Sequence, residues 1–164
     1  MSRRWQFSET SLLAAPRLSV WAHAATMAGV NAELAPLARM THPRGMDRLD
    51  LDAVPLGRRA FRSWVLLFGV LPVEYDDLTF VSLDAGYGFR EASPLLTQRV
   101  WIHERRLEDV AGGCRLTDSL TFEPRIAWLG GLQRHLFRFF FRHRHRQLRR
   151  IFGRLSSPDF GRHG

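Results

Sequence analysis

The C-terminal forty residues separate apolar from basic side chains at helical spacing, and this pattern constrains the fold more than any other feature of the chain. Between Arg125 and Gly164 there are ten arginines and a single acidic residue, Asp159. Residues 1–124 hold fourteen arginines and fifteen acidic residues, so they are nearly neutral. Because all 24 basic residues of the chain are arginines, we attribute the high pI to compositional bias and not to a nucleic-acid partner.

At 100° per residue, residues 127–152 form one amphipathic helix of about 39 Å, bounded by Pro124 and Gly153. Its apolar stripe is centred on Leu129, Leu132, Leu136, Phe140 and Ile151 and is widened by Phe137, Phe141, Leu148 and Phe152. The opposite side carries Arg134, Arg138, Arg142, His145 and Arg149.

The favoured interpretation of this helix is that its apolar side closes a core and its arginines face water. Two alternatives remain open, in which Arg134, Arg138, Arg142 and Arg149 contact either nucleic-acid phosphates or an anionic membrane surface. The aromatic residues lie on the face that we expect to be buried, and stacking on bases would instead place them among the arginines.

Length and composition predict one domain, residues 1–155, followed by a flexible tail, 156–164. A chain of 164 residues with 45% hydrophobic residues can bury a substantial core. Cys114 is the only cysteine, which excludes an intramolecular disulfide and suits a reducing compartment. The apolar run Trp64–Leu71 is too short to span a bilayer, and the N-terminus does not resemble a signal peptide. We expect a soluble, cytoplasmic protein without a metal or other cofactor.

The remaining pattern predicts an α+β chain in which helices flank a run of strands. A first strand at 7–13 precedes two short helices, one beginning at Pro16 and one at 30–37, and a polar loop at 41–56. Period-two strands follow at 59–68, 78–83, 87–93, 98–107 and 115–122, joined by short turns as in an antiparallel meander. A twisted sheet of about six or seven strands around the long helix leaves a cavity between helix and sheet.

This order of elements and several local motifs resemble the START/SRPBCC superfamily, the helix-grip fold of birch-pollen-allergen-like proteins. The resemblance covers nearly the whole chain and rests on AAPRLSVW, GFRE, RVWIHERR, CRLTDSLTFEPR and FRHRHRQLRRIFG. The W-x-H-x-R and T-D-x-L-x-F-x-P series is similar to bacterial members described as polyketide cyclase/dehydratase-like or as ligand-binding. The resemblance implies non-catalytic binding of a hydrophobic or aromatic molecule, lipid- or polyketide-like; a cyclase or dehydratase is the alternative.

Strand parity places several polar side chains on the inner face of the sheet. Arg99, Trp101, His103 and Arg105 share one face of their strand, Glu91 shares the parity of Phe89, and Asp118 lies among Leu116, Leu120 and Phe122. We expect Glu91, Trp101, His103 and Asp118 to form a polar row on the cavity wall, with Arg99 nearby. His103 with Asp118 or Glu91 could act as a general acid/base on an enolisable carbonyl, or the pair could only fix the strand register.

The expected apolar lining consists of Trp64, Leu66, Phe68, Phe89, Leu136 and Phe140, although core packing alone would explain each of them equally well. Arg144 lies at the edge of the helix's apolar stripe. It could reach a ligand carboxylate or Asp118, or extend outward into water.

Overall fold

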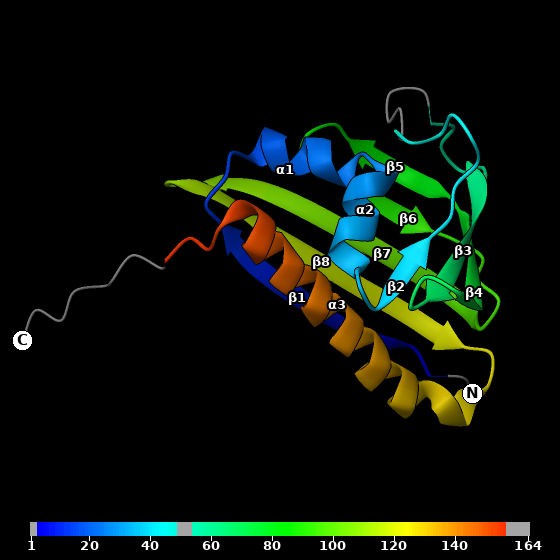
Figure 1. Ribbon diagram of the computed structural model, residues 1–164. Helices are drawn as coiled ribbons and strands as arrows, with labels where there is room; N and C mark the ends of the chain where they lie inside the picture. The colour runs from blue at the N-terminus through cyan, green and yellow to red at the C-terminus, as the bar shows by residue number, and fades with distance from the viewer. Residues whose placement is uncertain (1–2, 49–53, 157–164) are drawn as a thin grey trace, which may run out of the picture.

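The computed structural model describes residues 3–48 and 54–156, and within these ranges the chain folds as two antiparallel sheets and a long C-terminal helix (Figure 1). The strands are β1 (Trp5–Leu13), β2 (Ala38–Met40), β3 (Phe61–Leu67), β4 (Leu71–Leu78), β5 (Phe80–Asp84), β6 (Gly88–Ala92), β7 (Gln98–Val110) and β8 (Gly113–Pro124). The helices are α1 (Arg17–Ala24), α2 (Met27–Leu34), the short 3₁₀ helix η1 (Ala127–Leu129) and α3 (Gly130–Phe152). The larger sheet has the order β1-β8-β7-β6-β5, and the smaller one β2-β3-β4.

Helix α3 runs along β1 and β8 and also packs against α2, which confirms the predicted helix (Figure 1). It begins at Gly130, where an added Cβ would lie 2.2 Å from the indole nitrogen of Trp5. It ends at Gly153, whose φ of 77° suits a residue without a side chain.

The apolar stripe predicted for α3 is confirmed only in part, because the buried side is centred on residues predicted at its edge. Leu132 is 67% exposed, Leu136 and Ile151 are also exposed, and His145, predicted on the solvent side, is only 2% exposed. The buried line instead includes Phe141, His145 and Leu148. The reason is that a polar side chain can face inward where a buried partner binds it, and Ser11 and Asp118 provide such partners for His145.

The second helix begins earlier than predicted, because Thr26 caps it. The Thr26 hydroxyl accepts a hydrogen bond of 3.0 Å from the Gly29 amide, so α2 starts at Met27 and not near residue 30. It ends at Leu34, just before the Ala35–Pro36 step.

The strands form two sheets where the sequence predicted one curved sheet. Strand β4 lies largely in a segment for which the sequence predicts no strand, and it pairs with β3. Thr79 separates β4 from β5, so the chain passes from the smaller sheet to the larger one within a single residue. The segment predicted as a loop at 41–56 includes residues 49–53, which lie outside the described residues, as do 157–164 of the predicted tail.

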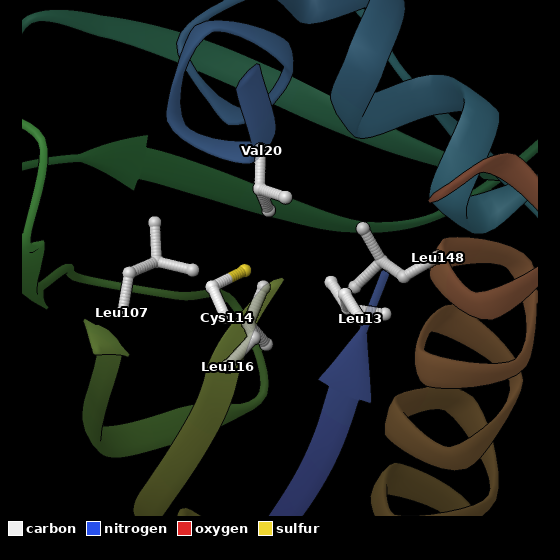
Figure 2. Packing of buried hydrophobic residues seen from close by; sticks show 6 residues of the cluster. All are labelled: Leu13, Val20, Leu107, Cys114, Leu116 and Leu148. Atoms are coloured by element: carbon white, nitrogen blue, oxygen red, sulfur yellow. The ribbon is translucent and has the colours of Figure 1, made fainter. Parts of the chain in front are cut away.

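The apolar core is divided into several clusters, one of which lies beside the C-terminal half of α3. One cluster joins β1, α1, β7, β8 and α3 through Leu13, Val20, Leu107, Cys114, Leu116 and Leu148 (Figure 2). Burial raises the pKa of the Cys114 thiol, as expected for a structural cysteine. Within the described ranges, the helices are too short or too polar to cross a bilayer.

Candidate functional site: a cavity with a charged wall

A cavity of about 350 Å³ lies between α3, α2 and the two sheets. Its lining is mainly apolar and comes from every layer of the fold. It includes Trp21 and Ala24 of α1, Met27, Val30 and Leu34 of α2, Ala38 and Met40 of β2, Val65 and Leu67 of β3, Val73, Leu78 and Phe80 of β4 and β5, and Phe137 and Phe141 of α3. The place of the cavity, between helix and sheet, matches the sequence prediction.

Seven of the residues predicted for the ligand site line this cavity: Phe89, Glu91, Trp101, His103, Leu136, Phe140 and Arg144. The predicted Trp64, Leu66 and Phe68 are absent from the lining described by the structure, where Val65 and Leu67 of the same strand take their place. Trp64 is 42% exposed and packs on Tyr75, and Phe68 is 67% exposed beside the β3–β4 turn. The alternation along β3 is therefore real, but the inward side is the opposite one.

Arg99 was also placed on the wrong face. The register of β7 against β8 shifts between Gln98 and Val100. This irregularity turns Arg99 to the solvent and buries Gln98, while Trp101 and His103 keep the inward direction predicted for them.

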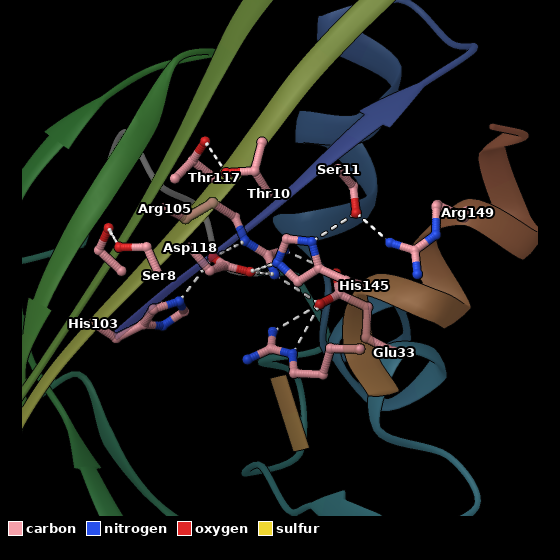
Figure 3. A network of polar contacts seen from close by, with 12 residues as sticks. Ser8, Thr10, Ser11, Glu33, His103, Arg105, Thr117, Asp118, His145 and Arg149 are labelled. Atoms are coloured by element: carbon pink, nitrogen blue, oxygen red, sulfur yellow. Dashed lines mark hydrogen bonds and ion pairs between the residues drawn. The ribbon is translucent and has the colours of Figure 1, made fainter. Parts of the chain in front are cut away.

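Asp118 lies fully buried on β8, beside the cavity and not among its lining residues, and it is the centre of a charged network (Figure 3). Its Oδ1 lies 2.9 Å from His103 Nε2 and accepts a hydrogen bond of 2.8 Å from Arg105 Nε. Its Oδ2 accepts a second bond of 2.8 Å from Arg105 and lies 3.0 Å from His145 Nε2. Strand parity predicted the inward direction of Asp118 correctly, but its predicted place on the cavity wall is wrong, because these contacts hold it behind the wall.

Arg105 links Asp118 to Glu33, a buried carboxylate on α2. Its Nη1 and Nη2 each donate a bond of 2.9 Å to Glu33. Arg144 donates two more to Glu33, of 3.0 Å and 2.8 Å, so it neither extends into water nor bonds Asp118, two of the alternatives left open from the sequence. Charge-assisted bonds of this kind join α2, α3 and the larger sheet through one buried guanidinium.

The carboxylates of this network are held in their ionised form. Burial opposes ionisation, but the charges of Arg105 and Arg144 outweigh it and lower the pKa of Glu33 to about 2. Burial likewise opposes ionisation of Asp118, yet Arg105 and the bonded histidines hold its pKa well below the usual range.

His103 lies between two carboxylates. In addition to the contact with Asp118, its Nδ1 lies 3.7 Å from Glu91 Oε2. Burial would lower the pKa of His103, but the hydrogen bond to Asp118 and the nearby carboxylate of Glu91 outweigh it and raise the pKa. Both ring nitrogens are directed at carboxylates, so this geometry does not present a free nitrogen to a substrate.

A second carboxyl pair, Asp76 and Glu91, lies on the cavity wall. Asp76 belongs to β4 and is 7% exposed, and Glu91 belongs to β6 and is 5% exposed. Burial and then the neighbouring Glu91 raise the pKa of Asp76 well above its usual range. Burial opposes ionisation of Glu91, but its bond to His103 outweighs it and lowers the pKa. Asp76 is therefore the member of the pair that takes up a proton more readily.

The cavity wall also carries buried polar atoms whose hydrogen-bonding capacity is unused. Asp76 Oδ1, Trp101 Nε1 and Gln133 Oε1 lack a hydrogen-bond partner within residues 3–48 and 54–156. Such atoms are costly when a cavity is dry, so a polar ligand group would stabilise them. In the same ranges, no group of three or more histidine, cysteine or carboxylate side chains is arranged to hold a metal ion.

Comparison with known proteins identifies the family. A family model described as a domain of unknown function (DUF8410) matches residues 11–152. The chain belongs to this family. No curated protein matches the chain significantly in sequence.

Solved structures show that this DUF8410 member has the START/SRPBCC helix-grip fold. Protein CV1439 from Chromobacterium violaceum is 14% identical with a TM-score of 0.68, covering 90% of this chain and 96% of its own. Ara h 8.0201 is 12% identical with a TM-score of 0.63, covering 92% and 98%. A START superfamily protein from Mycobacterium smegmatis is 8% identical with a TM-score of 0.63, covering 90% and 96%.

Four ionisable residues of the site were not predicted from the sequence to belong to it: Glu33, Asp76, Arg105 and His145. Arg105 shares the strand face of His103, and His145 follows Phe141 by four residues, so both carried a usable signal. Asp76 lies in the strand that was not predicted, and Glu33 lies in a short helix whose pattern does not single out one face.

Proposed function

We propose that the protein binds a hydrophobic or aromatic small molecule, lipid- or polyketide-like, in this cavity without catalysing a reaction on it. The observation that carries the proposal is the cavity itself, which combines a mainly apolar lining with unused polar atoms. Its volume of about 350 Å³ is within the range of about 300–1,000 Å³ found for small-molecule sites. The helix-grip fold is a ligand-binding scaffold, which supports the same function.

The lining favours an aromatic or branched apolar ligand. Phe137 packs edge-to-face on Trp101, with ring centroids 5.2 Å apart, and Phe80 does so on Phe89 at 5.4 Å. Burying about 200 Å² of ligand surface among such groups contributes about 5 kcal/mol before the costs of association. This is enough for modest affinity, and the polar atoms would then orient the ligand.

The two alternative functions receive less support. A cyclase or dehydratase would need a free acid or base, whereas His103 and Asp118 are bound to each other and to further charged groups. On the basic face, Arg138 and Arg142 contact Glu9 of β1 at 3.2 Å and 3.1 Å. Arg149 donates to Ser11 at 2.7 Å. These contacts occupy part of the face that nucleic acid or a membrane would require.

Titration with the fluorescent probe N-phenyl-1-naphthylamine tests the proposal. We expect saturable binding to the wild type, and a discrete extra mass in native mass spectra if the purified protein carries a ligand. Ala24→Leu on α1 places a larger side chain in the cavity wall and should weaken probe binding, whereas Ala22→Leu on the exposed side of α1 should not. Equal binding by both folded variants, as judged by thermal unfolding, would contradict the proposal.

A further inference from the structure

The polar part of the cavity wall is a carboxyl pair that lacks a matching cation. Asp76 and Glu91 both line the cavity, and the carboxyl group of Glu91 raises the pKa of Asp76. Glu91 has further partners, since Ser93 donates a bond of 2.6 Å to its Oε1 and His103 lies beside its Oε2. Asp76 Oδ1 has no partner among the described residues, although it is buried in the wall.

The charged groups around Asp76 are already engaged elsewhere. Glu74, on the same strand, accepts bonds from the Leu96 amide and from Thr97. His103, on β7, lies between Glu91 and Asp118. Arg144, the cation of α3 that lines the cavity, bonds Glu33. Every described cation that faces the cavity thus already pairs with a carboxylate other than Asp76, so Asp76 lacks a cationic partner among the described residues.

The position of the shared proton determines which kind of ligand group fits. Two carboxylates in contact hold a proton between them, because both cannot ionise in a buried site. Asp76 Oδ1 has no partner among the described residues, so it is the carboxyl oxygen of the pair that is left for a ligand. Gln133 Oε1, on the α3 side of the cavity, is a second unused acceptor. A ligand group that satisfies these two oxygens is a donor, while Trp101 Nε1 is available to an acceptor elsewhere on the same ligand.

Aromatic rings lie directly beside this acceptor site. Phe80 is paired with Glu91 across β5 and β6, and Phe89 precedes Glu91 by two residues on the same face. A cation placed at the carboxyl pair would therefore lie near aromatic rings, whose faces attract cations.

We infer that the cavity accepts a hydrophobic amine, whose ammonium group binds at Asp76 and Glu91 and whose apolar body lies among the aromatic rings of the lining. This inference rests on the proposed function and specifies the chemistry of its ligand. The ammonium group takes the place of the shared proton, so that the charge of the wall is unchanged. Binding therefore releases the proton of Asp76, and amine affinity rises with pH for as long as the amine itself stays protonated.

Three probes that share one ring system test the inference: 2-naphthylmethylamine, 2-naphthylmethanol and 2-naphthoate. Isothermal titration calorimetry at pH 7, in two buffers of different ionisation enthalpy, gives both the affinity and the number of protons released. We expect the amine to bind about tenfold or more tightly than the alcohol, since charge-assisted bonds exceed neutral ones by this order. We also expect release of about one proton with the amine and little with the alcohol.

Asp76→Asn keeps the shape of the side chain and removes the titrating group. In this variant, amine affinity should fall to the level of the alcohol and proton release should disappear. The control is Asp77→Asn on the neighbouring residue, whose side chain bonds Arg62 at 2.7 Å and is not part of the cavity lining that the structure describes. This control should leave amine binding unchanged.

The possible outcomes separate the inference from the proposed function. If the wild type binds alcohol and amine equally, or binds without proton release, the amine inference is refuted and cavity binding stands. Tightest binding of 2-naphthoate would also refute it and would assign the polar end of the ligand to Arg144. If N-phenyl-1-naphthylamine binds but the naphthyl probes do not, the amine inference alone fails. If none of the four probes binds, both the amine inference and the proposed function fail.

Discussion

Replacing Arg105 by methionine should destabilise the fold strongly, because this guanidinium neutralises two buried carboxylates at once. Arg105 is 1% exposed and donates four hydrogen bonds of 2.8–2.9 Å to Glu33 and Asp118, both fully buried. Methionine fills a similar volume but leaves the network with excess negative charge. Removing one partner of a buried ion pair typically costs about 3–5 kcal/mol. For a chain of this length, that loss lowers Tm by roughly 6–20 °C.

Urea denaturation measures the free energy of unfolding of Arg105→Met, and Arg106→Met, at the next residue of the same strand, is the control. Arg106 is exposed and bonds Glu104 at 2.7 Å, so its replacement should leave stability nearly unchanged. The loss of stability at low pH is a second measure of the network's contribution. Because the folded pKa of Glu33 is about 2, against 4.5 ordinarily, its contribution is present above pH 4.5 and is lost as pH falls toward 2. Arg105→Met should reduce this loss. Equal unfolding free energies of the two variants would refute the role assigned to the network.

Two further predictions can be checked with matched residues. His103 should titrate above pH 6.5 in two-bond ¹H–¹⁵N spectra, because its carboxylate partners outweigh burial, whereas burial lowers the pKa of His23. A neutral His103 at pH 6 would contradict the position assigned to it between carboxylates. Gly130→Ala should cost about 1–3 kcal/mol, since its Cβ would collide with an indole of β1. Gly131→Ala has open space and should stabilise α3 by up to about 1 kcal/mol, and thermal unfolding that gives the reverse order would contradict this packing.

The sequence predicted side-chain direction best where polar and apolar residues alternate strictly. In β8, Leu116, Asp118, Leu120 and Phe122 all face inward as predicted, because residues of the opposite parity are small and polar. Those outward residues pair with their counterparts on β1, as between Ser8 and Ser119 at 2.8 Å. A strand of this kind has only one orientation that buries its apolar side.

Prediction failed on β3 because both of its sides are apolar. Trp64 and Leu66 lie on one side of the strand, and Val65 and Leu67 lie on the other. Because all four are apolar, the sequence does not show which side faces inward. The larger side chains suggested a lining of Trp64 and Phe68. The structure places the smaller Val65 and Leu67 against the cavity, while Trp64 packs on Tyr75 at the outer surface.

Buried charges could not be predicted from periodicity, because their partners are distant in the sequence. Glu33 and Arg105 are separated by 72 residues, and His145 and Asp118 by 27. A helical pattern assigns a histidine among arginines to the solvent side, and only the tertiary contact reverses that assignment. Periodicity could indicate that Asp118, Arg105 and His145 point inward, but it could not show that these three side chains bind one another.

The charge balance of the site separates structural groups from the group available to a ligand. With His103 protonated, the described cations His103, Arg105 and Arg144 offset Glu33, Glu91 and Asp118, so this buried set is neutral. A neutral, fully bonded set joins α2, α3 and the sheet and keeps the cavity wall in place before a ligand arrives, which lowers the cost of binding. Asp76 lies outside this balance, with an acceptor oxygen in the wall and a proton that an incoming cation can replace. Asp76, the carboxyl group that the network leaves without a cation, is therefore the position at which a cationic ligand gains the most binding free energy.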